Sequence, residues 1–195
     1  MGTVESRVAS RFILAYRSKG LMKQLRSVFK NMPDYVFNDT IKKNWSLSGA
    51  GWVDNFIKNW EESGLTLEGY AHHEADKYPM PENFFGLLNY KWTKQIIKVN
   101  LFDFDRSTQE HIMEREFGEK NPNNVPYDKE RTELQRQKAV GDGKNEPITV
   151  FKNDKKYGLL EGWHRTMGLL KLGDNGNKDP RKWKRVTINA WVGEI

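Results

Sequence analysis

The chain has 195 residues and contains no cysteine, which excludes disulfide bonds, a thiolate nucleophile and a zinc site with sulfur ligands. No apolar run approaches the roughly 20 residues that a membrane-spanning helix requires, and the first residues lack the pattern of a secretory signal. We therefore expect a cytoplasmic protein without a transmembrane segment.

The excess positive charge is confined to the first quarter of the chain. Residues Met1–Gly51 hold nine Lys and Arg against three acids, and the remaining residues hold 23 of each sign, which gives the net charge of +6. A basic segment attracts DNA, RNA, acidic partners or an anionic membrane without specific chemistry. The candidate nucleic-acid contacts are Arg7, Arg11, Arg17, Lys19, Lys23 and Arg26. A solvated helix face explains the same charges equally well.

Apolar spacing predicts a mainly helical region before Tyr90. Apolar residues recur at three- and four-residue intervals in three segments, 5–19, 21–31 and 52–63, so we expect helices there. Segment 69–89 contains two prolines and two glycines and is expected to be irregular. We place a boundary near Tyr90, which divides the chain into a basic, mainly helical region 1–90 and a second domain 91–195.

Strands and helices alternate after Tyr90. A run rich in β-branched and aromatic residues predicts a strand over 95–104. Ser107 and Glu110 fit a capping box that begins a helix ending near Phe117. The remaining expected elements are a charged helix 128–140, a strand 147–151, a turn at 153–154, a strand 157–161, a helix 163–172 capped by Gly173, and a strand 185–192. This order predicts an α+β fold.

The segment Glu161-Gly162-Trp163-His164-Arg165-Thr166 joins the expected strand 157–161 to the expected helix 163–172. The first amides of a helix have no partner within the helix and, with the helix dipole, favour an anion. Glycine permits a close approach of the backbone to a ligand. Arg165 can grip phosphate oxygens, His164 can donate to one or move a proton, and Thr166 adds a hydroxyl. We therefore predict a phosphate site that includes Gly162 and Trp163. A lone His-Arg pair at a helix start is more often an ordinary surface turn.

A divalent metal is a further possibility at this turn. Glu161 stands at the expected end of a strand, where its carboxylate can hold Mg²⁺ or act as a base. Asp103 and Asp105 flank Phe104 on the expected strand 95–104 and would face the same side of it. If the fold brings them close to Glu161, the three acids can share a metal ion.

The string Glu146–Phe151, then Lys156–Thr166, then Gly168–Gly173 resembles the ParB/sulfiredoxin superfamily. In that family a proline, a short strand, a turn, a strand that ends in an acid, a Gly-x-His-Arg turn and a helix follow one another. The similarity extends over about 95–195 and is sharpest over 146–173. It implies a ParB/sulfiredoxin-like domain with a small mixed sheet and flanking helices. No resemblance covers residues 1–90.

The resemblance also implies a ligand and roles for residues of the turn. The family includes CTP-binding partitioning clamps, free serine kinases, sulfiredoxins and ParB-like nucleases, so it implies a nucleoside triphosphate or diphosphate (ATP, ADP or CTP) with Mg²⁺. His164 and Arg165 match the pair that grips phosphate, and Glu161 matches the acid that assists phosphoryl transfer in kinase members. Sulfiredoxins carry a cysteine where Trp163 stands, so repair of sulfinic acid is excluded.

Three functions remain open from the sequence. The first is an enzyme, a phosphotransferase or nucleoside-triphosphate hydrolase in which Glu161 and His164 are catalytic. The second is a nucleic-acid-binding protein or ParB-like nuclease that uses the basic N-terminal segment. The third is an interaction protein that keeps the fold without the chemistry.

Overall fold

The computed structural model describes residues 20–43, 49–78, 84–117, 129–141, 146–177 and 179–195. These residues belong to two compact units, Met1–Tyr90 and Lys91–Ile195. The predicted helix 5–19 lies outside the described residues. None of the described helices combines the length and apolar character that crossing a membrane requires.

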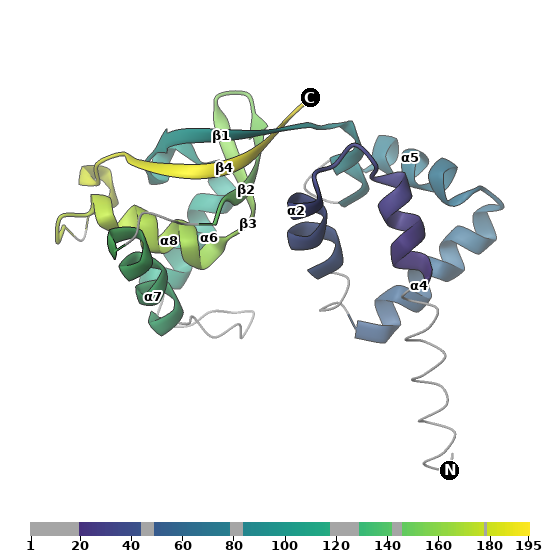
Figure 1. The fold of residues 1–195 in the computed structure, drawn as a ribbon, viewed down its shortest axis with the longest axis horizontal. Coiled ribbons are helices and arrows are strands. Elements are labelled where there is room, and N and C mark those ends of the chain that lie inside the picture. Colours follow the sequence, from purple (N-terminus) through teal and green to yellow (C-terminus); the bar gives the residue numbers. More distant parts are fainter. Residues whose placement is uncertain (1–19, 44–48, 79–83, 118–128, 142–145, 178) are drawn as a thin grey trace, which may run out of the picture. The chain divides into compact units, whose positions relative to one another are not determined.

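The first unit is helical in its described parts (Figure 1). A helix over 20–28 is followed by α2 (Asp34–Val36), which continues into a π-helix (Phe37–Lys42), and then by α4 (Gly49–Ser63), α5 (Leu67–Lys77) and a 3₁₀ helix (Phe84–Asn89). Aromatic rings form its core around Phe85, whose ring stacks on that of Phe29 at 6.2 Å between centroids and on that of Phe56 at 5.7 Å.

The prediction of an irregular segment 69–89 is wrong, because α5 occupies much of it. The Thr66 hydroxyl caps this helix by accepting a hydrogen bond from the Gly69 amide at 3.1 Å. Tyr70, Ala71 and Ala75 are buried at helical spacing. Burial of this face outweighs the low helix propensity of Gly69, which weakened the helical signal in the sequence.

The second unit is a four-stranded mixed sheet with helices on one face (Figure 1). Its strands are β1 (Lys91–Val99), β2 (Ile148–Asn153), β3 (Lys156–Glu161) and β4 (Val186–Glu194), in the order β1-β4-β2-β3. The β2–β4 pair is parallel and the other two are antiparallel. The helices are α6 (Arg106–Phe117), α7 (Lys129–Gly141) and α8 (Trp163–Leu170). The predicted α+β class is confirmed.

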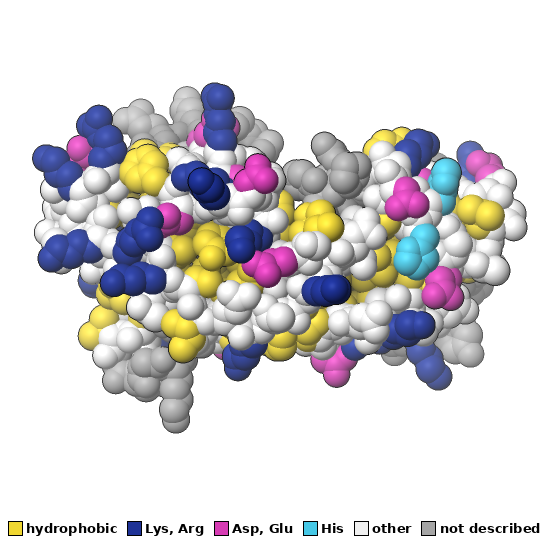
Figure 2. Space-filling view, turned by 90° about the horizontal axis from the view of Figure 1, so that it is seen from above, with side chains coloured by type: hydrophobic (Ala, Val, Ile, Leu, Met, Phe, Trp, Pro, Cys, Tyr) yellow, Lys and Arg dark blue, Asp and Glu magenta, His cyan; other side chains and the backbone are white. Residues whose placement is uncertain are grey.

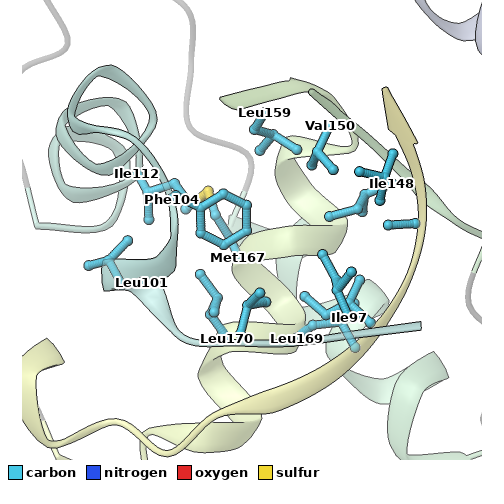
Figure 3. Close-up of a cluster of buried hydrophobic side chains, with 14 of the residues drawn as sticks. Ile97, Leu101, Phe104, Ile112, Ile148, Val150, Leu159, Met167, Leu169 and Leu170 are labelled. Carbon is cyan, nitrogen blue, oxygen red and sulfur yellow. The ribbon is translucent and has the colours of Figure 1, made fainter. Parts of the chain in front are cut away.

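The core of this unit lies between the sheet and the helices (Figure 3). Alternate residues of each strand point toward α8, as the two-residue repeat of a strand requires. Thus Ile148 and Val150 of β2 are fully buried and meet Met167 and Leu170 of α8. Phe104, also fully buried, closes the cluster on the side of α6.

Two predicted details between β1 and α6 are wrong. The strand predicted over 95–104 begins earlier and ends at Val99, and a short 3₁₀ helix (Leu101–Asp103) follows it. Helix α6 begins at Arg106 rather than after a Ser107 cap, because the Asp105 carboxylate accepts a hydrogen bond from the Thr108 amide at 2.8 Å. Asp105 is therefore the side-chain cap of this helix.

Gly173 does not form the predicted left-handed C-terminal cap. It lies in a 3₁₀ turn (Lys171–Gly173) that extends α8, and the left-handed residues follow it at Asn175 and Gly176. Glycine is required there for space, because the carbonyl of Lys184 lies where a side chain would stand, and the Lys184 amide donates to the Gly173 carbonyl at 2.8 Å.

Candidate functional site

The turn between β3 and α8 is built on Gly162. Its backbone is left-handed, with φ of 95° and ψ of 27°, a conformation that side chains disfavour. A Cβ at this position would lie 2.9 Å from Cγ2 of Ile148 on β2. Both the backbone angle and the neighbouring strand therefore require glycine. As the N-cap of α8, Gly162 places no side chain over the start of the helix.

Arg165 joins the start of α8 to the start of β2. Its Nη1 donates to the Pro147 carbonyl at 2.8 Å and to the Glu146 carboxylate at 3.1 Å. The Arg165 side chain is only 11% exposed, whereas that of Glu146 is 77% exposed. The structure thus gives Arg165 a positioning role that the sequence did not predict. Its positive charge remains within the first turn of α8.

Glu161 and Thr166 are buried on either side of this first turn. Glu161 is 9% exposed, and its Oε2 accepts a hydrogen bond from the Gly162 amide at 3.1 Å. Thr166 is fully buried, and its Oγ1 has no hydrogen-bond partner among the described residues. The predicted contact between the Thr166 hydroxyl and phosphate does not fit this burial, because a ligand outside the turn cannot reach the atom.

Trp163 and His164 are partly exposed at the first turn of α8. The Trp163 ring packs edge-on against that of His111 on α6, with centroids 5.7 Å apart and planes at 67°. His111 is exposed, and its Nδ1 lies 2.9 Å from the Ser107 carbonyl oxygen. Sequence reasoning missed His111 because it belongs to a distant element, and no local pattern links it to the turn.

Helix α7 packs closely on α8. A Cβ at Gly168 of α8 would lie 2.8 Å from the Thr132 carbonyl oxygen of α7, so the glycine allows the two backbones to approach. On α7, Arg136 donates to both carboxylate oxygens of Glu133, at 2.8 and 2.7 Å. These hydrogen bonds lower the pKa of Glu133 and raise that of Arg136. The two side chains satisfy each other, and their charged neighbours are Lys171 and Asp174, which follow α8.

The acids proposed as metal ligands have other partners. Asp103 accepts from the Asn100 amide at 2.8 Å and from Arg185 at 2.7 Å. It lies in a 3₁₀ helix rather than on a strand, and Asp105 caps α6. Among the described residues no group of three His, Cys, Asp or Glu side chains is arranged to hold a metal ion. The structure therefore does not join Asp103 and Asp105 with Glu161.

The predicted nucleic-acid contacts near the N-terminus are only partly described. Arg7, Arg11, Arg17 and Lys19 lie outside the described residues. Lys23 is exposed on the helix over 20–28.

The structure gives Arg26 partners within the protein. Its guanidinium donates to the Asp34 carboxylate at 2.7 Å, to the Met32 carbonyl at 3.0 Å and to the Phe29 carbonyl. Arg26 therefore ties the end of its helix to the start of α2. This arrangement does not fit the predicted contact with nucleic acid, because the donors are already engaged.

Residues 91–195 thus define an α+β domain with a strand–glycine–helix turn. No family model matches the chain, and no curated protein matches it. A solved structure of sulfiredoxin from Arabidopsis thaliana matches 51% of this chain and 88% of that chain, with 18% identity and a TM-score of 0.32. A TM-score this low is not evidence of a shared activity.

Proposed function

We propose that the turn Glu161–Thr166 binds the phosphate groups of a nucleotide and that the protein is a phosphotransferase or nucleoside-triphosphate hydrolase. The observation that carries the proposal is the passage from β3 through left-handed Gly162 directly into α8, with His164 partly exposed at the first turn. A helix start combines oriented backbone N–H groups with the positive end of the dipole, and both favour an anion.

The residues of the turn have distinct roles in this proposal. His164 donates a hydrogen bond to a phosphoryl oxygen and stabilises the charge that develops on the transferred group. Arg165 holds the start of α8 against the Pro147 carbonyl and adds positive charge beside the phosphate. Glu161, at the end of β3, activates the acceptor hydroxyl or water, directly or through Mg²⁺. The ligands that the family resemblance implies are ATP, ADP or CTP with Mg²⁺.

A thermal-shift panel tests binding directly. ATP, ADP, CTP, GTP and pyrophosphate are each added with and without Mg²⁺, since a ligand that binds only the native state raises the melting temperature. At a ligand concentration about 100 times the Kd, the native state gains about 2.7 kcal/mol. If none of these ligands raises the melting temperature at millimolar concentration, the proposal is wrong.

Variants at the turn then test the roles. We expect His164→Ala to lower nucleotide affinity about tenfold or more, as loss of a hydrogen bond to a charged group does. The control His73→Ala removes an exposed histidine of α5 and should leave the shift unchanged. Glu161→Gln should abolish phosphate release while nucleotide still raises the melting temperature. If Glu161→Gln releases phosphate at the wild-type rate, Glu161 has no catalytic role.

A further inference from the structure

The sheet of the second unit has a face that α6, α7 and α8 of the same unit do not cover. Helices α6, α7 and α8 all lie on the other side, where the core is (Figure 1). Ile97, Ile188 and Val150 point into that core, so their neighbours along each strand point to the opposite face. We call this opposite side the open face. Figure 2 is seen from this side and shows hydrophobic side chains with Lys and Arg around them and some Asp and Glu among these.

One row of the open face alternates aromatic rings with glycines. Trp92, Gly193, Phe151 and Gly158 are neighbours in register across β1, β4, β2 and β3. A Cβ at Gly193 would lie 2.9 Å from the Trp92 ring, and one at Gly158 would overlap the Phe151 ring. Each ring therefore occupies the space of the missing side chain. The Phe151 ring is itself buried, with only 5% exposed, whereas the Trp92 ring is partly exposed.

The next rows add a further aromatic ring and positive charge. Trp191 of β4 is partly exposed and pairs in register with Lys94 of β1. The following pairs along the same strands are Ile96 with Asn189 and Lys98 with a threonine. Both lysines are exposed, and Ile96 is 72% exposed. These side chains stand on two neighbouring strands, about 4.8 Å apart.

The acids of the open face lie at its β3 edge, away from the lysines of β1. Glu161 pairs with Thr149 at this edge and is only 9% exposed, and the Asp105 carboxylate lies 2.8 Å from the position of a Gly158 Cβ. The partners in register with the exposed lysines Lys94 and Lys98 are Trp191 and Thr187, so neither lysine faces a carboxylate across the β1–β4 pair. A surface of this kind complements a partner that carries negative charge at regular intervals and apolar flat groups between the charges.

We infer that the open face binds single-stranded nucleic acid, with Trp191 stacking on a base and Lys94 and Lys98 contacting phosphates. Bases of a single strand are unpaired and offer flat surfaces to aromatic side chains, whereas those of a duplex are stacked on each other. Lysine neutralises backbone phosphate without reading sequence. Trp191 and the two lysines lie outside the turn Glu161–Thr166, although the row of Trp191 continues through Thr149 to Glu161. The inference does not depend on the function proposed for the turn.

Fluorescence anisotropy of labelled oligonucleotides tests the inference with the full chain. Oligo-dT and oligo-U of about 12 nucleotides are compared with a duplex of the same length at low salt. We expect the wild-type protein to bind at least one single strand more tightly than the duplex, and the better of the two shows whether the ligand is DNA or RNA. Absence of binding to both, or equal binding to the duplex, would refute the inference.

Paired lysine variants locate the surface. The double variant Lys94→Gln/Lys98→Gln should lower affinity about tenfold at low salt. It should also reduce the slope of log K against log salt by about 1.4, because each phosphate contact to a single strand contributes about 0.7. The control Lys138→Gln/Lys182→Gln removes the same charge from exposed lysines of α7 and of a 3₁₀ turn (Pro180–Lys182). If the two double variants lose the same affinity for the oligonucleotide, the nucleic acid binds elsewhere on the protein.

Trp191 provides the second readout. Trp191→Ala should weaken binding at least about fivefold, and Trp191→Tyr should restore most of the affinity because it keeps a stacking ring. If Trp191→Ala does not fold, the exposed lysine pair still decides the question.

One result would overturn the inference in favour of the basic N-terminal segment. It is full affinity in the lysine double variant together with loss of binding in Arg7→Gln/Arg11→Gln/Arg17→Gln. If nucleotides still raise the melting temperature of both Trp191 variants, the nucleic-acid site is distinct from the phosphate-binding turn.

Discussion

Gly162 is the residue on which the geometry of the turn depends most. Its left-handed backbone and its closeness to Ile148 are independent obstacles to any side chain. Gly176 has the first obstacle without the second, because its φ is 75° and nothing lies within 4 Å of its missing Cβ. The two glycines therefore allow backbone strain and side-chain overlap to be measured separately.

We expect Gly162→Ala to reduce the free energy of unfolding by about 2 kcal/mol or more, the sum of a left-handed alanine and an overlap with Ile148. Gly176→Ala should cost about 1 kcal/mol, from the backbone alone. Chemical denaturation of both variants measures the difference. Equal losses of unfolding free energy in the two variants would show that Ile148 moves aside without an energetic cost. The nucleotide-induced thermal shift should fall in Gly162→Ala and persist in Gly176→Ala.

We expect the substitution of threonine by valine to have opposite effects on stability at two buried positions. The Thr166 hydroxyl has no partner among the described residues, whereas that of Thr108 accepts a hydrogen bond from the Leu159 amide at 3.0 Å. Thr166→Val should leave the free energy of unfolding unchanged or raise it by up to about 1 kcal/mol, because no hydrogen bond is lost. Thr108→Val should lower it by about 1–3 kcal/mol, since the Leu159 amide loses its acceptor.

Thr166→Val also tests the contact that the sequence predicted. The buried position implies an unchanged nucleotide-induced thermal shift in this variant. A lost shift, in a protein that unfolds at the wild-type denaturant concentration, would show that the hydroxyl becomes accessible and contacts the ligand.

At the scale of single elements, helix α6 shows why its cap was misassigned. Ser107 and Glu110 have the spacing of a capping box, but the helix already begins at Arg106. Asp105 directly precedes it, and its carboxylate accepts a hydrogen bond from the Thr108 amide. We expect Asp105→Ala to cost about 1 kcal/mol of stability, and Ser107→Ala to stay within about 0.5 kcal/mol of wild type. Thermal unfolding of the two variants decides between the caps. A larger loss in Ser107→Ala would contradict the structure.

The elements around the turn were predictable because their signals are local. Strand β3, the glycine and the start of α8 follow one another within a few residues, so alternation and the helical repeat locate them. Helix α5 was missed since Gly69 and the prolines beyond it suggested irregular structure. The burial of Arg165 was also missed, because it depends on a carbonyl at Pro147, which only the folded sheet brings near.

At the scale of the whole molecule, the α+β class followed from the order of elements, but the strand order did not. Pairing of β1 with β4 joins residues such as Lys91 and Glu194, and no short pattern encodes a contact over that separation. The same limit applies to the open face. Its rows combine residues from all four strands, so the aromatic and basic character becomes visible only when the register is known.

The position of β4 between β1 and β2 sets the order in which the chain can assemble during synthesis. The β2–β3 hairpin can close by itself, but β1 has no neighbour until Val186–Glu194 has left the ribosome. Until then Ile97 and Val99 lack their partners, and the nascent polypeptide presents an unpaired strand to chaperones and to other copies of itself. Completion of this domain is therefore a late event, governed by its last strand.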